Sequence, residues 1–169
     1  MAEPKTVELL GANNQSIRLS GAEASTSIAL DATVQNKLST NLRAAATAAA
    51  TPAVPDRIFL NLENVRGISD ATAFDVYLNV PEGANPANYP RNLAGRVALF
   101  GVRKASVVDS THAGDGLTFV LEISDVIDRL HLSGALAAGQ LHVRLVPRHP
   151  VPDEAQISIG RISVFRQGT

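Results

Sequence analysis

The chain has 169 residues, of which 45% are hydrophobic, 18% charged and 4% aromatic, and its formal net charge is −1. This composition fits a globular domain with a substantial core. It has no excess of basic residues and few aromatic ones, so it does not favour a surface that binds nucleic acid. The absence of cysteine excludes disulfides and thiolate metal sites, and no run of about 20 apolar residues predicts a membrane span.

The first 56 residues predict short strands followed by a connector. Alternating runs lie at 7–10, 16–19 and 25–30, with turn-forming residues between them. Residues 34–50 are rich in alanine and lead to two prolines, which indicates either a short helix or a tether; a membrane or partner helix is the less favoured interpretation. We expect residues 1–56 to pack on the same domain as the rest of the chain.

The clearest strand signal is FDVYLNV at residues 74–80. Phe74, Val76, Leu78 and Val80 share one face of an extended backbone, and the residues between them share the other. The prolines and glycine that follow end the strand. This pattern predicts a central strand with one face on a core.

Alternation continues on both sides of this strand. Further strands are expected at 57–65, 95–102, 116–123, 141–146 and 157–165. A short helix is expected at 124–131, with Ser124 as its N-cap and Gly134 as its terminator. Because the other gaps are too short for crossover helices, residues 57–169 predict a mainly β fold, either an antiparallel sandwich or a partly closed barrel, with one or two short helices.

The last strand changes its phase. Ile157 and Ile159 have one parity, whereas Ile162 and Val164 have the other. A bulge at Gly160-Arg161 would bring both pairs to the core, because one extra residue shifts the side-chain alternation by one.

Residues 81–92 contain three prolines, a glycine and three asparagines. We therefore expect a long, ordered excursion and not a tight hairpin, and loops of this length are often functional.

Catalytic and metal-binding patterns are missing from the sequence. No two of the four histidines lie three or four residues apart, so no helix face presents a paired imidazole site; they are His112, His131, His142 and His149. No Gly-x-Ser-x-Gly elbow accompanies the serines. We predict no catalytic residue and no metal site, and a structural ion pair between Asp75 and Arg144 or Arg148.

The order of five segments resembles the C-terminal domain of tyrosinases and plant polyphenol oxidases, which is named for a Lys-Phe-Asp-Val signature. Around the strand at 74–80, the five segments lie at 57–65, 94–102, 123–130, 141–148 and 157–165, and the resemblance covers roughly residues 25 to 166. Here Ala73 replaces the lysine, and Phe74, Asp75 and Val76 remain.

The resemblance implies a non-catalytic accessory domain that covers the entrance to a dicopper site. It implies a tyrosinase-type catalytic core as partner, in cis or as a cleaved fragment, with the copper held by that core. This chain has too few histidines to build a dicopper centre from two sets of three. For the side chain that plugs the pocket, the bulky candidates are Tyr89 and, in second place, Leu117.

An alternative from another class is a stand-alone β-sandwich that binds a ligand or assembles into a homo-oligomer through an edge strand. The absence of tryptophan argues against a carbohydrate platform, because sugars commonly stack on aromatic rings.

Overall fold

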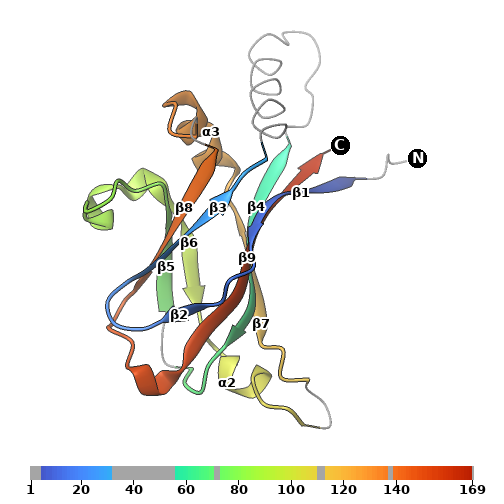
Figure 1. Cartoon of the computed structure of the whole chain (residues 1–169), viewed down its shortest axis with the longest axis vertical. Helices are drawn as coiled ribbons and strands as arrows, with labels where there is room; N and C mark the ends of the chain where they lie inside the picture. The colour runs from blue at the N-terminus through green and yellow to red at the C-terminus, as the bar shows by residue number, and fades with distance from the viewer. Residues whose placement is uncertain (1–4, 32–55, 71–72, 110–112, 137–138, 169) are drawn as a thin grey trace.

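Two antiparallel sheets pack face to face in this computed structural model, which describes residues 5–31, 56–70, 73–109, 113–136 and 139–168 (Figure 1). The first sheet has the strand order β1-β9-β4-β7, with β2 also paired to β9, and the second has the order β3-β8-β5-β6. The strands are β1 (Thr6–Asn13), β2 (Ile17–Leu19), β3 (Ala24–Ala29), β4 (Arg57–Arg66), β5 (Ala73–Leu78), β6 (Leu93–Ala98), β7 (Leu117–Glu122), β8 (Gln140–Pro147) and β9 (Ile157–Gly168). The predicted β-sandwich is confirmed.

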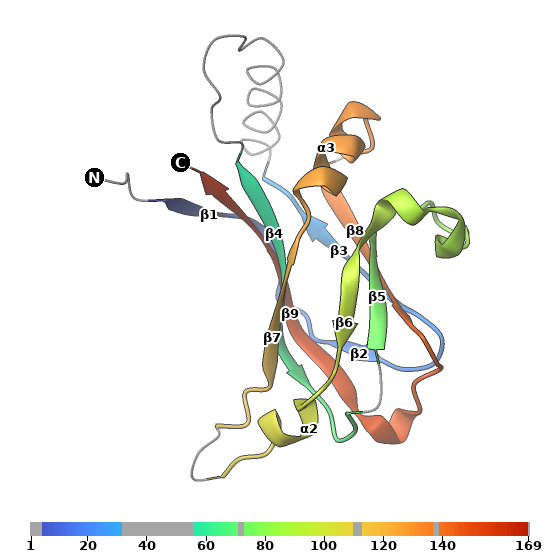
Figure 2. The ribbon, with the colours of Figure 1, turned by 180° about the vertical axis from the view of Figure 1, so that it is seen from behind.

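Two short helices close opposite ends of the sandwich. Helix α3 (Ser124–Leu132) follows β7 at one end, and helix α2 (Val102–Ala105) follows β6 at the other (Figure 2). The 3-10 turns are η1 (Pro86–Asn88), η2 (Pro90–Asn92) and η3 (Asp153–Ala155). No helix in the described ranges is long and apolar enough to cross a bilayer. The alanine-rich connector predicted at 34–50 lies outside the described residues.

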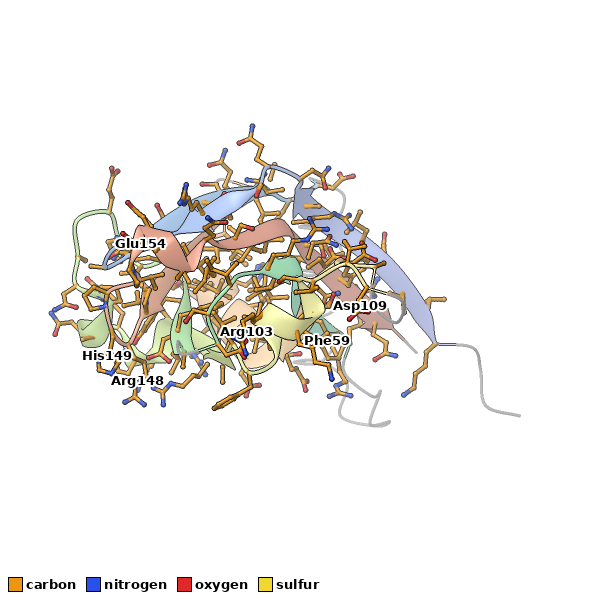
Figure 3. The ribbon with its side chains drawn as sticks, turned by 90° about the horizontal axis from the view of Figure 1, so that it is seen from below. Phe59, Arg103, Asp109, Arg148, His149 and Glu154 are labelled. Atoms are coloured by element: carbon orange, nitrogen blue, oxygen red, sulfur yellow. The ribbon has the colours of Figure 1, made fainter. Side chains whose placement is uncertain are left out.

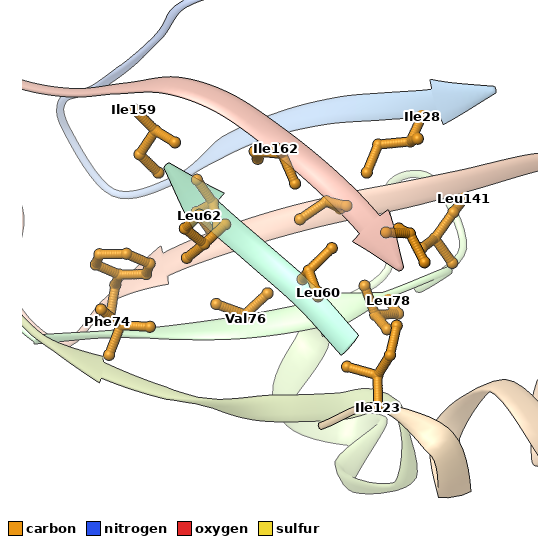
Figure 4. Close-up of a cluster of buried hydrophobic side chains, with 14 of the residues drawn as sticks. Ile28, Leu60, Leu62, Phe74, Val76, Leu78, Ile123, Leu141, Ile159 and Ile162 are labelled. Atoms are coloured by element: carbon orange, nitrogen blue, oxygen red, sulfur yellow. The ribbon is translucent and has the colours of Figure 1, made fainter. Parts of the chain in front are cut away.

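The core lies between the sheets and takes apolar side chains from both (Figure 4). The predicted central strand is β5, and Phe74, Val76 and Leu78 are each 0% exposed. Leu99, Val143 and Leu145 are likewise 0% exposed. Leu121 is only partly buried, and its side chain packs against the core beside Gly95.

The strand predicted at 95–102 is wrong at its C-terminal end. Strand β6 stops at Ala98, and the chain turns at Gly101, whose φ of 79° lies in the left-handed region that favours glycine. Leu99 and Val102 are both buried although they are three residues apart. That spacing suits a helical turn, which is why apolar alternation alone placed the boundary too late.

The start of α3 differs from the prediction by one residue. Ile123 is the N-cap, and Ser124 is the first helical residue. The Ser124 hydroxyl accepts a hydrogen bond from the backbone N–H of Ile58 at 2.9 Å, so it joins the helix to β4 instead of capping it. Gly134 adopts a φ of 75° just after the helix, as expected for a terminator.

The predicted phase change in β9 is present, but it is shared with β4. All four apolar residues of β9 are buried: Ile157, Ile159, Ile162 and Val164. Leu62 and Val65 of β4 are buried as well, and they pair with Ile162 and Ile159 without a register shift between the two strands. Both apolar pairs reach the core as expected, but β4 and β9 change phase at the same level, so the ladder between them contains no bulge at Gly160-Arg161.

Asn64 and Gly160 make this shared phase change possible. Asn64 has a φ of 54°, which asparagine tolerates better than most residues. A Cβ atom on Gly160 would lie 2.8 Å from the Cβ of Asn64. The two strands can stay paired here because position 160 carries no side chain.

Replacing Leu78 with alanine should lower the free energy of unfolding by about 2–5 kcal/mol, because the change removes buried methyl groups and leaves a cavity. Chemical denaturation measures the loss. Leu132→Ala is the control, since Leu132 is 80% exposed. A loss no larger than that of the control would contradict the assignment of Leu78 to the core.

Gly160→Ala should destabilise the fold by about 1–3 kcal/mol, because the new methyl group meets the fixed Cβ of Asn64. Gly95→Ala is a matched control within a strand: its methyl group would meet the Cδ2 atom of Leu121, which can rotate away. Thermal unfolding of both variants tests the prediction, and equal losses would show that the contact with Asn64 is not the cause.

Candidate functional site

The segment from Pro81 to Asn92 forms an ordered excursion between β5 and β6, as predicted. It contains the consecutive 3-10 turns η1 and η2. The Asn85 side chain accepts a hydrogen bond from the N–H of Ala87 at 3.0 Å, and Pro86 is buried. Local side-chain bonds and two prolines thus fix the backbone of this loop.

Three polar side chains attach the loop to the sandwich. Arg144 of β8 donates to the carbonyl oxygens of Ala84 and Pro81, at 2.6 and 3.4 Å. Arg129 of α3 donates to the carbonyl oxygen of Arg91 at 3.0 Å, and the Asn92 amide donates to that of Leu78 at 2.8 Å. We call these three side chains the loop anchors: Arg129, Arg144 and Asn92.

Arg144 is the most enclosed part of this attachment. Its side chain is 14% exposed, and its Nε lies 2.7 Å from a carboxylate oxygen of Glu23. The same guanidinium therefore joins the segment before β3 to the loop after β5. Charge-assisted bonds of this kind hold a loop more firmly than neutral ones.

Tyr89 lies between η1 and η2 and is half-buried. Its backbone N–H donates to the carbonyl oxygen of Pro86, and its own carbonyl oxygen accepts from Asn92. Leu117, the other candidate from the sequence, is the first residue of β7 and packs partly buried against the core.

The structure does not bring Tyr89 and Leu117 together. The loop that carries Tyr89 is bonded to α3 through Arg129, at one end of the sandwich. The N–H of Gly116, just before Leu117, donates to the carbonyl oxygen of Ala105 in α2, at the other end. A single pocket could therefore receive only one of the two.

The signature strand divides its side chains between core and surface. Phe74 and Val76 are fully buried, whereas Asp75 points outward. Its partner is Arg96 of β6, with Nε to Oδ1 at 2.6 Å, so the expected pairing with Arg144 or Arg148 is wrong. The hydrogen bond to Asp75 and the carboxylate charge raise the pKa of Arg96 above its ordinary value.

The structure describes three of the four histidines, His131 of α3, His142 of β8 and His149, and they lie on different elements. His142 is exposed on β8, and its Nδ1 lies 2.8 Å from the Ser27 hydroxyl. His149 is exposed in the loop after β8, and His112 lies outside the described residues. Within the part of the chain that the structure describes, no group of three or more His, Asp or Glu side chains could hold a metal ion.

Sequence reasoning missed Phe100. It lies in the turn between β6 and α2, inside the stretch predicted as strand, and its side chain is 81% exposed. Three other exposed apolar residues lie in the loops at this end of the sandwich, and together we call the four the α2-end patch: Ile68, Phe100, Val107 and Val108. The pair Phe100-Gly101 was the available signal, because a glycine inside an expected strand indicates a turn.

Hydrogen bonds join the loops that carry this patch. Asp70 accepts from the backbone N–H of Arg103 at 2.8 Å, and the Ser106 hydroxyl accepts from that of Gly67 at 3.0 Å. Figure 3 looks onto this end of the molecule, with Arg103 of α2 and Asp109 of the next loop labelled. Hydrogen bonds therefore hold the backbone of the loops that carry the patch.

Three findings relate the chain to known proteins. A family model described as a domain of unknown function, DUF7868, matches residues 6–167. The tyrosinase HcTyr1 of Hahella sp. (strain CCB-MM4) is 28% identical over 111 residues, which cover 66% of this chain and 23% of that protein. Recombinantly expressed latent aurone synthase, a polyphenol oxidase, shares the fold with a TM-score of 0.53 at 15% identity, over 90% of this chain and 25% of that chain.

The resemblance to the C-terminal β-domain of tyrosinases and polyphenol oxidases is thus confirmed, in sequence by the tyrosinase and in fold by the polyphenol oxidase. The matched parts of this chain cover 23% of HcTyr1 and 25% of the latent aurone synthase, so most of the length of both proteins lies outside the match.

Replacing Arg144 with methionine should loosen the loop and lower the free energy of unfolding by about 1–3 kcal/mol, since two carbonyl oxygens lose their donor. Hydrogen exchange at the amide of Tyr89 should become faster. Arg96→Met is the matched control, because it removes an arginine from the neighbouring surface without touching the loop. Unchanged exchange at Tyr89 in the Arg144 variant would show that Arg144 is not an anchor.

Proposed function

Because the chain belongs to the DUF7868 family and is a tyrosinase-like C-terminal domain, we propose that it is a non-catalytic accessory domain that shields the dicopper site of a tyrosinase-type core. The observation that carries this proposal is the partial match: the chain corresponds to about a quarter of a tyrosinase. The remaining three quarters are then the catalytic partner, in cis or after cleavage, and copper is bound there and not in this chain.

The sandwich suits this role because it is stiff. Strands β1 and β2 pair with β9, and β3 pairs with β8, so the N-terminal strands and the rest of the chain act as one unit. Loops at either end of such a unit keep a fixed position relative to a partner. A side chain held over a narrow pocket excludes substrate without any chemistry of its own.

Shielding is a binding equilibrium. Substrate enters only when the domain has moved away, so the degree of inhibition follows the fraction of core that is covered. A linked domain has a high effective concentration and can inhibit strongly even when its intrinsic affinity is modest. Cleavage of the linker then activates the enzyme by dilution.

Tyr89 and Leu117 remain the two plug candidates that the sequence supplies. Tyr89 has the better support of the two, because its loop is anchored by Arg129, Arg144 and Asn92 while the residue itself is only partly buried. Leu117 already packs against the core of its own domain, so its insertion elsewhere would cost contacts.

One observation supports assembly as a second function. The outer face of the β1-β9-β4-β7 sheet carries a row of paired apolar residues, Leu9, Phe165 and Phe59, and Val7 and Val120 are also exposed. Arg57 lies over the Phe59 ring at 5.1 Å. A second copy of the chain could cover this face, and light scattering would detect the resulting dimer.

Substituting this chain for the matching region of HcTyr1, with a protease site in the linker, tests the proposal. We expect low diphenol oxidation before cleavage and at least tenfold higher activity after cleavage and dilution, because dissociation uncovers the pocket. Tyr89→Gly should raise the activity of the uncleaved chimera if Tyr89 is the plug.

Two controls accompany this experiment. The isolated chain gives the baseline and should oxidise neither monophenols nor diphenols, and HcTyr1 cut at its own linker gives the activity of the free core. If the uncleaved chimera is as active as the free core although cross-linking shows the domain bound, the shielding role is wrong.

A further inference from the structure

The large exposed apolar side chains are unevenly distributed. Half of the eight that the described residues contain belong to the α2-end patch, and Phe100 is the most exposed of all, at 81%. Within the patch, Val108 is 77% exposed, and Ile68 and Val107 are more than half exposed. A phenyl ring in water is unfavourable for an isolated domain, and exposed apolar side chains gathered at one end of a fold mark contact surfaces.

The base of Phe100 is fixed. Leu99 and Val102 on either side are each 0% exposed, so both flanks of the turn are held in the core. The N–H of Ala105 donates to the carbonyl oxygen of Gly101 at 3.0 Å. The ring therefore projects from a rigid turn, and inserting it into a partner costs little further order.

We propose that Phe100 is the side chain that enters the active-site mouth of the tyrosinase-type core, with the α2-end patch sealing the rim. This inference rests on the proposed shielding function and assigns it a surface. Binding hot spots are commonly built from one aromatic anchor, with other apolar side chains of the same surface excluding water once the partner is bound. Arg103 and Lys104, both exposed in α2, supply a polar, basic margin.

The chemistry of the partner favours phenylalanine. A pocket that accepts phenols is shaped for a six-membered aromatic ring, and the Phe100 side chain is that ring without the hydroxyl group that reacts. It can occupy the pocket without being converted. Tyr89 carries the phenol itself, so as a plug it would present a reactive group to the enzyme that it inhibits.

Geometry separates the two candidates cleanly. Tyr89 precedes β6 and Phe100 follows it, so the strand of six residues holds them at opposite ends. Six extended residues span about 20 Å. If Phe100 occupies the pocket, Tyr89 lies well outside it, and the two substitutions give independent results.

The test uses the uncleaved chimera with HcTyr1 described above. Phe100→Ala should raise its diphenol oxidation at least tenfold, which corresponds to a loss of about 1.4 kcal/mol in the closed state. Val108→Ala should raise it by a smaller factor. Leu132→Ala, at the α3 end and equally exposed at 80%, is the matched control and should change nothing.

The outcomes distinguish this inference from the proposed function. If the uncleaved parent chimera is not inhibited, the shielding function itself fails. If it is inhibited and Phe100→Ala stays equally inhibited, or if Tyr89→Gly alone releases activity, shielding stands and the assignment of Phe100 is overturned. If the isolated chain dimerises and Phe100→Ala makes it monomeric while inhibition is unchanged, the patch binds a second copy and the assignment is also overturned.

The variants should remain folded, because the Phe100 and Leu132 side chains contribute little buried surface. Equal melting temperatures for the three isolated variants and the parent chain verify this. A photoreactive benzophenone side chain at position 100 gives a second measurement: cross-links to the pocket mouth of the core support the assignment, and cross-links confined to a distant face contradict it.

Discussion

The pairing of β4 with β9 is the constraint on which the rest of the sandwich depends. Strand β9 also pairs with β1 and β2, so the β4–β9 ladder positions most of the first sheet. Its apolar residues face the core over the whole length only because both strands change phase at Asn64 and Gly160. A change in one strand alone would turn half of its isoleucines or leucines toward water.

The second sheet carries two loops that project at opposite ends of the sandwich. The hairpin of β5 and β6 has the anchored excursion with Tyr89 at one end and the turn with Phe100 at the other. Phe74, Val76 and Leu78 fix the hairpin to the core from β5. The sheet thus determines that the two aromatic side chains cannot serve one pocket together.

The hydrogen bonds and the exposed apolar side chains are distributed differently at the two ends of the β5–β6 hairpin. In the loop that carries Tyr89, the guanidinium groups of Arg144 and Arg129 donate hydrogen bonds to carbonyl oxygens. These bonds stabilise the domain itself. Around Phe100, hydrogen bonds within the turn and through the side chains of Asp70 and Ser106 hold the backbone, and the exposed apolar side chains remain in water. A contact surface needs the second arrangement, in which apolar area is still available for burial against a partner.

The sequence alone determined a mainly β fold, either a sandwich or a partly closed barrel, the central strand with Phe74, Val76 and Leu78, the ordered loop after it and the resemblance to a tyrosinase C-terminal domain, because alternation, prolines and segment order are local or additive signals. It placed the end of this strand at Val80, whereas β5 ends at Leu78. Only the tertiary structure decided the partner of Asp75, the shared phase change of β4 and β9, and the end of β6. Each of these depends on which strands become neighbours: Arg96 reaches Asp75 only through the β5–β6 pairing, and Asn64 meets Gly160 only across the β4–β9 ladder. The sequence did not predict the exposure of Phe100 for the same reason. An apolar residue in an alternating stretch is expected to lie in a strand, and only the fold shows that the strand has already ended.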